Sequence, residues 1–136
     1  MLYATKTALV ILDDLLPWQK VNIAAFLSGG IVHRYPGIIG EPYRDASGQT
    51  YAALIREPVF VFGADAAGLA RTHGRALSRG LDIALYIREM FATSNDADNR
   101  AAVAAVSGDG LDLVGIGLHA ERKIIDKVTA GLKFMS

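Results

Sequence analysis

Residues 113–132 read LVGIGLHAERKIIDKVTAGL, and this stretch decides the fold class. The apolar run through Gly115-Ile116-Gly117 predicts a buried strand, and the amphipathic pattern after it predicts a helix ending at Gly131. A Gly-x-Gly between a strand and a helix also occurs in dinucleotide-binding loops, but these need a third glycine at the start of the helix. The third glycine is absent here. We therefore interpret the two glycines as positions where the strand passes close under neighbouring side chains.

Strands and helices alternate through the rest of the sequence, as judged from the period of the apolar residues. The expected strands cover residues 7–14, 58–63, 81–87 and 111–118, and the expected helices cover 17–35, 66–80, 97–106 and 120–132. Asp65 is expected to cap the second helix, Gly80 to end it, and residues 45–49 to turn a hairpin. This alternation predicts a single α/β domain, residues 1–136, around a mostly parallel sheet.

The first expected helix contains an unusual pair of glycines. Its apolar residues, which fit one face loosely, are Trp18, Val21, Ala25, Ile31 and Val32. Gly29 and Gly30 lie in its interior, where each glycine costs about 1 kcal/mol relative to alanine. The pair predicts a place where another backbone or a ligand approaches the helix.

The composition fits a globular domain with a dense core, since 51% of the 136 residues are hydrophobic. The absence of cysteine excludes disulfides, thiolate catalysis and cysteine-based metal sites. No apolar run near the N-terminus has the length of a membrane span or the layout of a signal peptide. A soluble cytoplasmic protein without a membrane partner is expected, and no metal or organic cofactor is implied.

The charges balance, with 14 basic and 14 acidic side chains. A dedicated non-specific nucleic-acid binder carries a basic excess, because phosphate neutralisation supplies most of its affinity. Arg71, Arg75 and Arg79 recur every four residues and form an arginine stripe, which could contact RNA or could be a solvated helix face. The balance of charge favours the solvated face.

In parallel α/β sheets, sites lie beyond the carboxyl ends of the strands. The segments expected there are residues 13–20, 88–95 and 117–121. Lys20, in the first segment, could bind a phosphate or carboxylate or stabilise an oxyanion, or it could be an ordinary solvated lysine.

Two polar residues in the second segment could do related chemistry. Glu89 and Thr93 could orient a water molecule. Alternatively, Glu89 pairs with Arg88 or Arg56 and Thr93 caps a helix. His119 follows the last expected strand, but the histidines match no metal-ligand spacing, so no metal site is expected.

Both ends of the chain resemble the archaeal and eukaryotic type (type II) of peptidyl-tRNA hydrolase. The matching residues are Asp14-Leu15, Lys20, Ile23 to Ala25, Gly115 to Gly117, Ile125 to Thr129 and Leu132-Lys133. Nearly the whole chain is similar to an uncharacterised bacterial family, domain of unknown function 2000, through residues 13–30, 40–51 and 89–104. These resemblances imply a three-layer α/β/α sandwich with a mixed, mostly parallel four-stranded sheet, and a homodimer.

The hydrolases cleave the ester that joins a peptide to the tRNA ribose. By resemblance, the implied catalytic residues are Lys20, Glu89 and Thr93. The implied substrate-binding residues are Asp14, Asn22, Gly117 and His119.

The chain also departs from the hydrolase pattern. The family's second lysine is Asn22 here, its glutamine and histidine fall on Phe26 and Gly29, and its aspartate is the longer Glu89. A catalytic carboxylate that is displaced by about 1 Å can lower the rate of the reaction about 100-fold. Residues 94–107 are an additional segment that could close or block the site.

Three hypotheses follow from these departures. The favoured one is a pocket-bearing binding module for a small anionic ligand or a protein partner. The alternative is a hydrolase of an ester or amide, such as an aminoacyl- or peptidyl-tRNA-like substrate. RNA binding without cleavage, through the arginine stripe, ranks third.

Overall fold

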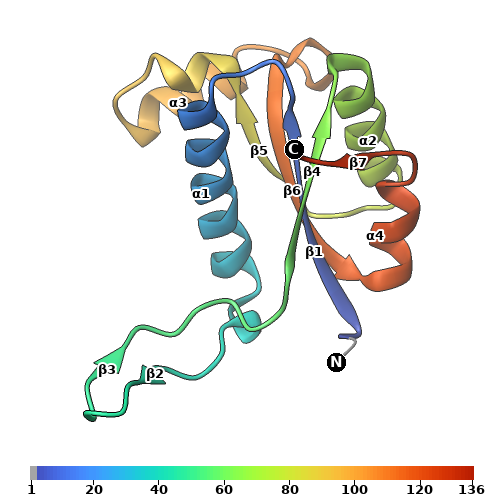
Figure 1. Ribbon diagram of the computed structural model, residues 1–136. Helices are drawn as coiled ribbons and strands as arrows, with labels where there is room; N and C mark the ends of the chain where they lie inside the picture. Colours follow the sequence, from blue (N-terminus) through green and yellow to red (C-terminus); the bar gives the residue numbers. More distant parts are fainter. Residues whose placement is uncertain (1–2) are drawn as a thin grey trace.

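A computed structural model describes residues 3–136 (Figure 1). The strands are β1 (Thr5–Leu12), β2 (Tyr43–Arg44), β3 (Thr50–Tyr51), β4 (Val59–Ala64), β5 (Ala84–Ile87), β6 (Leu113–Glu121) and β7 (Lys133–Phe134). The helices are α1 (Pro17–Arg34), α2 (Ala66–Ser78), α3 (Asp96–Ala104) and α4 (Arg122–Val128). Short 3₁₀ turns are η1 (Pro36–Ile38), η2 (Arg88–Phe91) and η3 (Gly108–Gly110). In the described chain, no helix combines the length and apolarity that crossing a membrane requires.

Five strands form one mixed sheet in the order β5-β6-β1-β4-β7. β1 and β4 are parallel, whereas the other three neighbouring pairs are antiparallel. The predicted mixed sheet is confirmed, but it has five strands instead of four, and only one of its four neighbouring pairs is parallel. β6 is reversed because residues 88–112, which follow β5, stay at the edge where β5 ends, so the chain re-enters the sheet from that edge. β7 is too short to produce a strand pattern.

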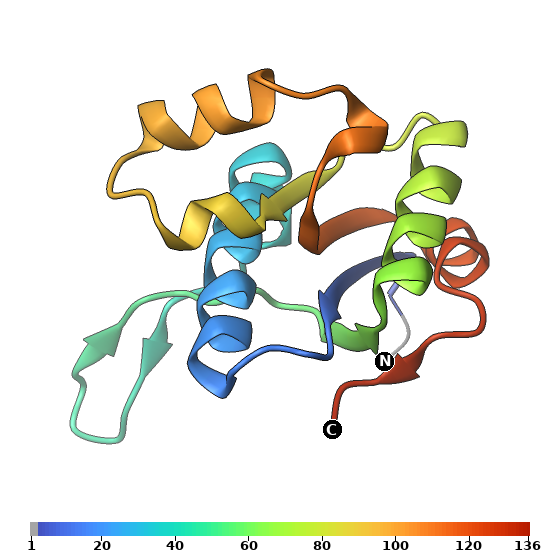
Figure 2. The ribbon, with the colours of Figure 1, turned by 90° about the horizontal axis from the view of Figure 1, so that it is seen from above.

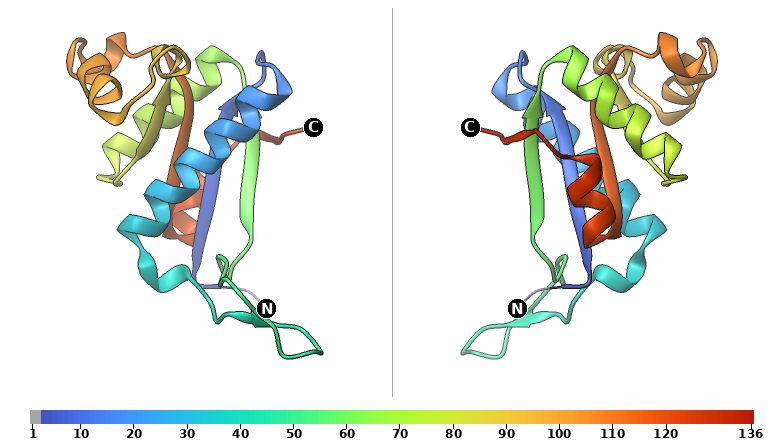
Figure 3. Two further views of the ribbon diagram at one scale, coloured as in Figure 1. Left: turned by 90° about the vertical axis from the view of Figure 1, so that its left-hand side faces the viewer. Right: turned by 90° about the vertical axis from the view of Figure 1, so that its right-hand side faces the viewer.

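Helices cover both faces of the sheet, as the α/β interpretation predicts (Figures 2 and 3). α1 packs against β5, β6 and β1 on one face, and α2 and α4 pack against β6 and β1 on the other. α3 contacts η2 beyond the carboxyl end of β5. The connection from β5 to β6 thus builds a wall at this edge of the sheet.

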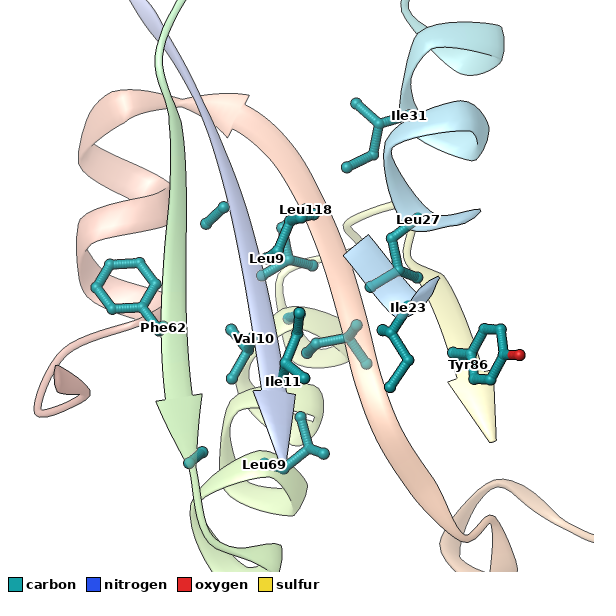
Figure 4. Close-up of a cluster of buried hydrophobic side chains, with 14 of the residues drawn as sticks. Leu9, Val10, Ile11, Ile23, Leu27, Ile31, Phe62, Leu69, Tyr86 and Leu118 are labelled. Atoms are coloured by element: carbon teal, nitrogen blue, oxygen red, sulfur yellow. The ribbon is translucent and has the colours of Figure 1, made fainter. Parts of the chain in front are cut away.

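Gly115 and Gly117 allow α1 to pack closely on β6. A Cβ atom at Gly115 would lie 2.5 Å from Ile23 Cγ2, and one at Gly117 would lie 2.8 Å from Ile31 Cδ1. Both distances are far below van der Waals contact, so a side chain at either position would push α1 outward. Figure 4 shows Ile23, Leu27 and Ile31 directed at the strands. The close-passage interpretation of the two glycines is confirmed.

The buried face of α1 differs from the prediction. The fully buried residues of this helix are Ile23, Leu27 and Ile31. Trp18 and Val21 are exposed instead, Val21 with 70% of its surface accessible. The prediction is right for Ile31 and wrong for Trp18, Val21 and Ala25. It fails because α1 carries no charged residue between Lys20 and Arg34, so the period of its apolar residues does not select one face.

The expected caps and the hairpin are confirmed. Asp65 accepts a 2.7 Å hydrogen bond from the backbone N–H of Gly68, and α2 stops before Gly80, which has φ +68°. β2 and β3 pair antiparallel around residues 45–49. Asn95 caps α3 by accepting from the backbone N–H of Asp98 at 2.8 Å.

Candidate functional site

A pocket of about 240 Å³ lies where α1, the end of β5, η2 and the start of α3 meet. Its lining residues are Phe26, Tyr86, Met90, Thr93, Ser94, Asn95, Asp96 and Asn99. One wall is aromatic and apolar, and the other carries hydroxyl, amide and carboxylate groups. The pocket lies beyond the carboxyl end of β5, at the edge of the sheet where ligands of α/β proteins are usually bound.

Four aromatic rings fix the apolar wall. The ring centroids of Phe26 and Tyr86 lie 5.6 Å apart, those of Tyr86 and Phe91 5.2 Å, and those of Phe91 and Trp18 5.8 Å. These contacts join α1 to β5 and η2 in tilted and edge-to-face arrangements that aromatic pairs favour. The wall is therefore preorganised.

The Tyr86 hydroxyl keeps a free proton. Asn22 Nδ2 donates to its oxygen at 3.1 Å. Burial raises the pKa of Tyr86, and the bond from Asn22 opposes this in part. The phenol is thus protonated at neutral pH and can donate to a second acceptor. Figure 4 shows the hydroxyl pointing away from the core.

The Thr93 hydroxyl is already engaged. It lies 3.1 Å from the carbonyl oxygen of Met90 and within hydrogen-bond distance of Asn99 Oδ1. A hydroxyl has one proton to donate, and both neighbours are acceptors. Thr93 therefore ties α3 to η2, and the start of the segment 94–107 forms a wall of the pocket.

Lys20 and Glu89 lie on neighbouring segments but do not line this pocket. Lys20 is half-buried in the first turn of α1, and Glu89 is exposed in η2. Within residues 3–136 neither side chain forms an ion pair, and Arg88 pairs with Asp112 at 3.1 Å. Asp14 is exposed in the loop between β1 and α1. Within the described part of the chain, no side-chain hydrogen bond or ion pair joins the three implied catalytic residues to one another.

Gly117 and His119 lie away from this edge. Because β6 runs antiparallel to β1, His119 stands opposite Thr7, near the beginning of β1. The expectation that residues 117–121 lie at the carboxyl edge is wrong, since it assumed that β6 was parallel. Gly117 is covered by α1, with Ile31 above it.

His119 belongs instead to a buried polar cluster. Its Nδ1 lies 2.8 Å from Thr7 Oγ1 and 3.4 Å from Glu57 Oε1. The Glu57 carboxylate also accepts hydrogen bonds from the hydroxyls of Thr5 at 3.1 Å and Thr7 at 3.4 Å. Glu57 precedes β4 and gives no sequence signal, because a glutamate beside a proline is normally solvated.

Acidification is expected to destabilise the protein through two histidines. Burial lowers the pKa of His119, an effect that Glu57 partly opposes, and burial also lowers the pKa of His73. The unfolded chain, with an ordinary histidine pKa of about 6.5, then binds more protons than the folded one. The stabilisation is present above about pH 6.5 and is lost as the pH falls from there through the lowered folded-state pKa values.

Urea denaturation between pH 8 and pH 5.5 measures this effect, a range above the titration of ordinary carboxylates. His73→Gln and His119→Gln are each expected to flatten the pH dependence. An unfolding free energy that stays constant over the range would contradict the role of burial.

Among residues 3–136, no three histidine, aspartate or glutamate side chains lie close enough together to hold a metal ion.

The chain is similar to a solved structure and matches one family model. A solved structure of a protein of unknown function from Agrobacterium tumefaciens is similar, with TM-score 0.96 and 45% identity over 99% of this chain and 100% of that one. No curated protein matches the chain. The family model described as a protein of unknown function, DUF2000, matches residues 5–136, and the chain belongs to this family.

Proposed function

We propose that the protein is a binding module whose ligand occupies the pocket beyond β5. The engagement of the Thr93 hydroxyl with Met90 and Asn99 carries this proposal. A hydrolase of the implied kind needs Lys20, Glu89 and Thr93 around one reacting group. Two of these residues are outside the pocket lining, and the third already has its acceptors.

The departures from the hydrolase pattern support the same proposal. Phe26 stands where the resemblance places a glutamine, and it forms part of the aromatic wall. Asn22 stands where the resemblance places a lysine, and it orients the Tyr86 hydroxyl. Both substitutions replace polar or charged groups by groups that shape a pocket.

The free polar groups indicate the class of ligand. Tyr86 offers an O–H donor and Ser94 an exposed hydroxyl, while the lining contains no basic residue. Asp96 lines the pocket as a carboxylate paired with Arg100. A small uncharged carbonyl compound with an apolar group fits these walls. A small anion, the ligand class that the sequence favours, would be bound by Lys20 outside the pocket.

Benzamide, with an aromatic ring and a neutral carbonyl group, is a suitable probe. Trp18 is the chain's only tryptophan and contacts the aromatic wall, so its fluorescence should report binding. Tyr86→Phe removes the hydroxyl and keeps the ring. It is expected to raise the Kd of benzamide by roughly fivefold to tenfold, the worth of one hydrogen bond.

Tyr3→Phe, which removes a tyrosine hydroxyl that donates to the Arg56 carbonyl outside the pocket, should leave this Kd unchanged. Benzoate has the same shape and a negative charge, and it should bind more weakly than benzamide. Equal benzamide affinity for wild type and Tyr86→Phe would contradict the pocket assignment. Benzoate binding that is lost in Lys20→Ala would place the ligand at the lysine instead.

A second candidate function is hydrolysis of an ester or amide by Lys20, Glu89 and Thr93. Two observations favour it. Lys20 and Glu89 form no ion pair in the described chain, so both charges are available to a substrate. The elements that carry them, α1 and η2, contact each other through Trp18 and Phe91. The resemblance to peptidyl-tRNA hydrolases suggests the reaction class.

RNA binding by the arginine stripe remains a third proposal. It is disfavoured because Arg75 Nη1 donates to the Ala130 carbonyl at 3.0 Å. The affinity for RNA would have to fall with rising salt, because phosphate contacts release counterions.

A further inference from the structure

The outer face of α1 is unusual for a helix in contact with water. Its exposed residues include Trp18, Val21, Ala25, Phe26 and Gly29. Solvated helix faces normally carry charged and polar side chains, and a helix that is apolar on all sides is normally buried. The apolar outer side of α1 therefore indicates an interface.

The hairpin formed by β2 and β3 is a second exposed element, and it carries two tyrosine rings among polar residues. It extends away from the sheet and helices (Figures 1 and 3), and every residue from 41 to 52 is exposed. Tyr43 and Tyr51 face each other across its two strands, so both rings lie on one side of the ribbon. An isolated two-stranded hairpin is only marginally stable in water, so contact of this side with a partner would stabilise it.

Internal hydrogen bonds hold the hairpin in one conformation. The Asp45 carboxylate accepts from the Ser47 hydroxyl at 2.6 Å, from the Tyr51 hydroxyl at 2.8 Å, and from the backbone N–H groups of Ser47 at 2.9 Å and Gln49 at 3.0 Å. These bonds lower the pKa of Asp45 to about 2. An arm that is ordered before it binds loses little conformational entropy on docking.

We propose that the outer face of α1 and the β2–β3 hairpin form a two-fold interface between two copies of this chain. The hairpin projects beyond the C-terminal end of α1, on the side of the sheet that α1 covers (Figures 1 and 2). Antiparallel pairing of the two α1 helices then brings each hairpin beside the first turns of the partner's α1. The two-fold axis makes every contact occur twice.

The available area is sufficient for a stable dimer. Seven large apolar side chains on these two elements and beside them are more than half exposed: Leu16, Trp18, Val21, Phe26, Tyr43, Tyr51 and Leu54. At on the order of 100 Å² each, the two copies offer about 1,400 Å², within the usual range for specific interfaces. The formal net charge of zero adds no repulsion between copies.

Gly29 leaves room for a second copy on the outer face of α1. A Cβ atom there would meet no atom of its own chain within 4 Å, so internal packing does not require this glycine. A glycine in a helix interior costs about 1 kcal/mol, and on an outer face it lets another backbone approach closely. The sequence predicts that another backbone or a ligand approaches α1 at its pair of glycines. We assign the approach at Gly29 to the α1 helix of the partner.

Sedimentation equilibrium of the full chain tests the interface. Wild type is expected to have twice the 14.5 kDa chain mass at micromolar concentration. Val21→Glu and Tyr43→Lys should each raise the dimer Kd by roughly 100-fold, since each puts two charges into an apolar contact. Both side chains are exposed in the single chain, so the variants should keep the wild-type circular dichroism spectrum. Leu77→Glu, at an exposed leucine of α2, is the matched control and should stay dimeric.

A mixture of charge variants tests the two-fold axis itself. Ala25 lies at the middle of α1, where the axis passes, so Ala25→Glu and Ala25→Lys should each be monomeric. Mixed in equal amounts, they should form a dimer. A monomeric wild type, dimers of Val21→Glu and Tyr43→Lys as stable as wild type, or a mixture that stays monomeric would each overturn the proposed interface.

Discussion

Replacement of Glu57 by alanine is expected to lower the free energy of unfolding by about 2–4 kcal/mol. Glu57 is 5% exposed, and its carboxylate faces the hydroxyls of Thr5 and Thr7 and the imidazole of His119. Removing it leaves the hydroxyls of Thr5 and Thr7 without their carboxylate acceptor and takes away the negative charge beside the His119 imidazole. This cluster joins β1, β6 and the residues before β4, so its loss should destabilise three neighbouring strands of the sheet.

Urea denaturation at pH 7.5 measures this change. Glu41→Ala, at an exposed glutamate, is the matched control and should stay within about 0.5 kcal/mol of wild type. Glu57→Gln retains a hydrogen-bonding side chain of the same length and should lose less than Glu57→Ala. A loss below about 1 kcal/mol for Glu57→Ala would mean that the cluster relaxes or hydrates freely.

The second large effect is expected for Gly115→Ala, at about 2–3 kcal/mol. The new methyl group would lie 2.5 Å from Ile23 Cγ2 and 3.3 Å from Leu27 Cδ1. Ile23 is branched at Cβ and has one strongly preferred rotamer in a helix, so it cannot turn away. The clash must be relieved by movement of α1 on β6, which disturbs the core.

Two further variants separate this clash from general effects of glycine replacement. Gly74→Ala, in the exposed interior of α2 with no atom within 4 Å, should raise stability by about 0.5–1 kcal/mol. Gly117→Ala meets Ile31 Cδ1, the atom that Ile31→Val removes, so the double variant should be more stable than the sum of the two single changes predicts. A Gly115→Ala protein as stable as wild type would contradict the close packing.

Much of the fold can be predicted from local patterns. The helices, the hairpin and the Asp65 cap each depend on residues within a few positions, whereas Gly115 and Gly117 act against Ile23 and Ile31 of α1, far away in the sequence. The direction of β6 depends on the path of the 25 residues between β5 and β6. No local sequence pattern predicts that path. The buried face of α1 was not predictable from apolar period, because both faces of this helix are apolar.

The site was only partly predictable for a related reason. Strand ends and the resemblance indicated Thr93 and Asn22, which lie in or against the pocket. Phe26, Tyr86 and Asn99 come from three different elements, and their convergence depends on tertiary packing. From the sequence alone, a phenylalanine on a helix and a tyrosine in a strand are expected to be core residues. Their place in the pocket lining therefore could not be predicted.

Hydrolysis of an N-blocked aminoacyl-tRNA tests most directly whether the site binds or cleaves. Release of the blocked amino acid is measured for wild type, for Lys20→Ala and for Lys123→Ala, an exposed lysine on α4 that serves as the matched control. A binding module should release it no faster than buffer alone in all three samples. Release by wild type and Lys123→Ala that disappears in Lys20→Ala would contradict the binding proposal and establish the hydrolase alternative.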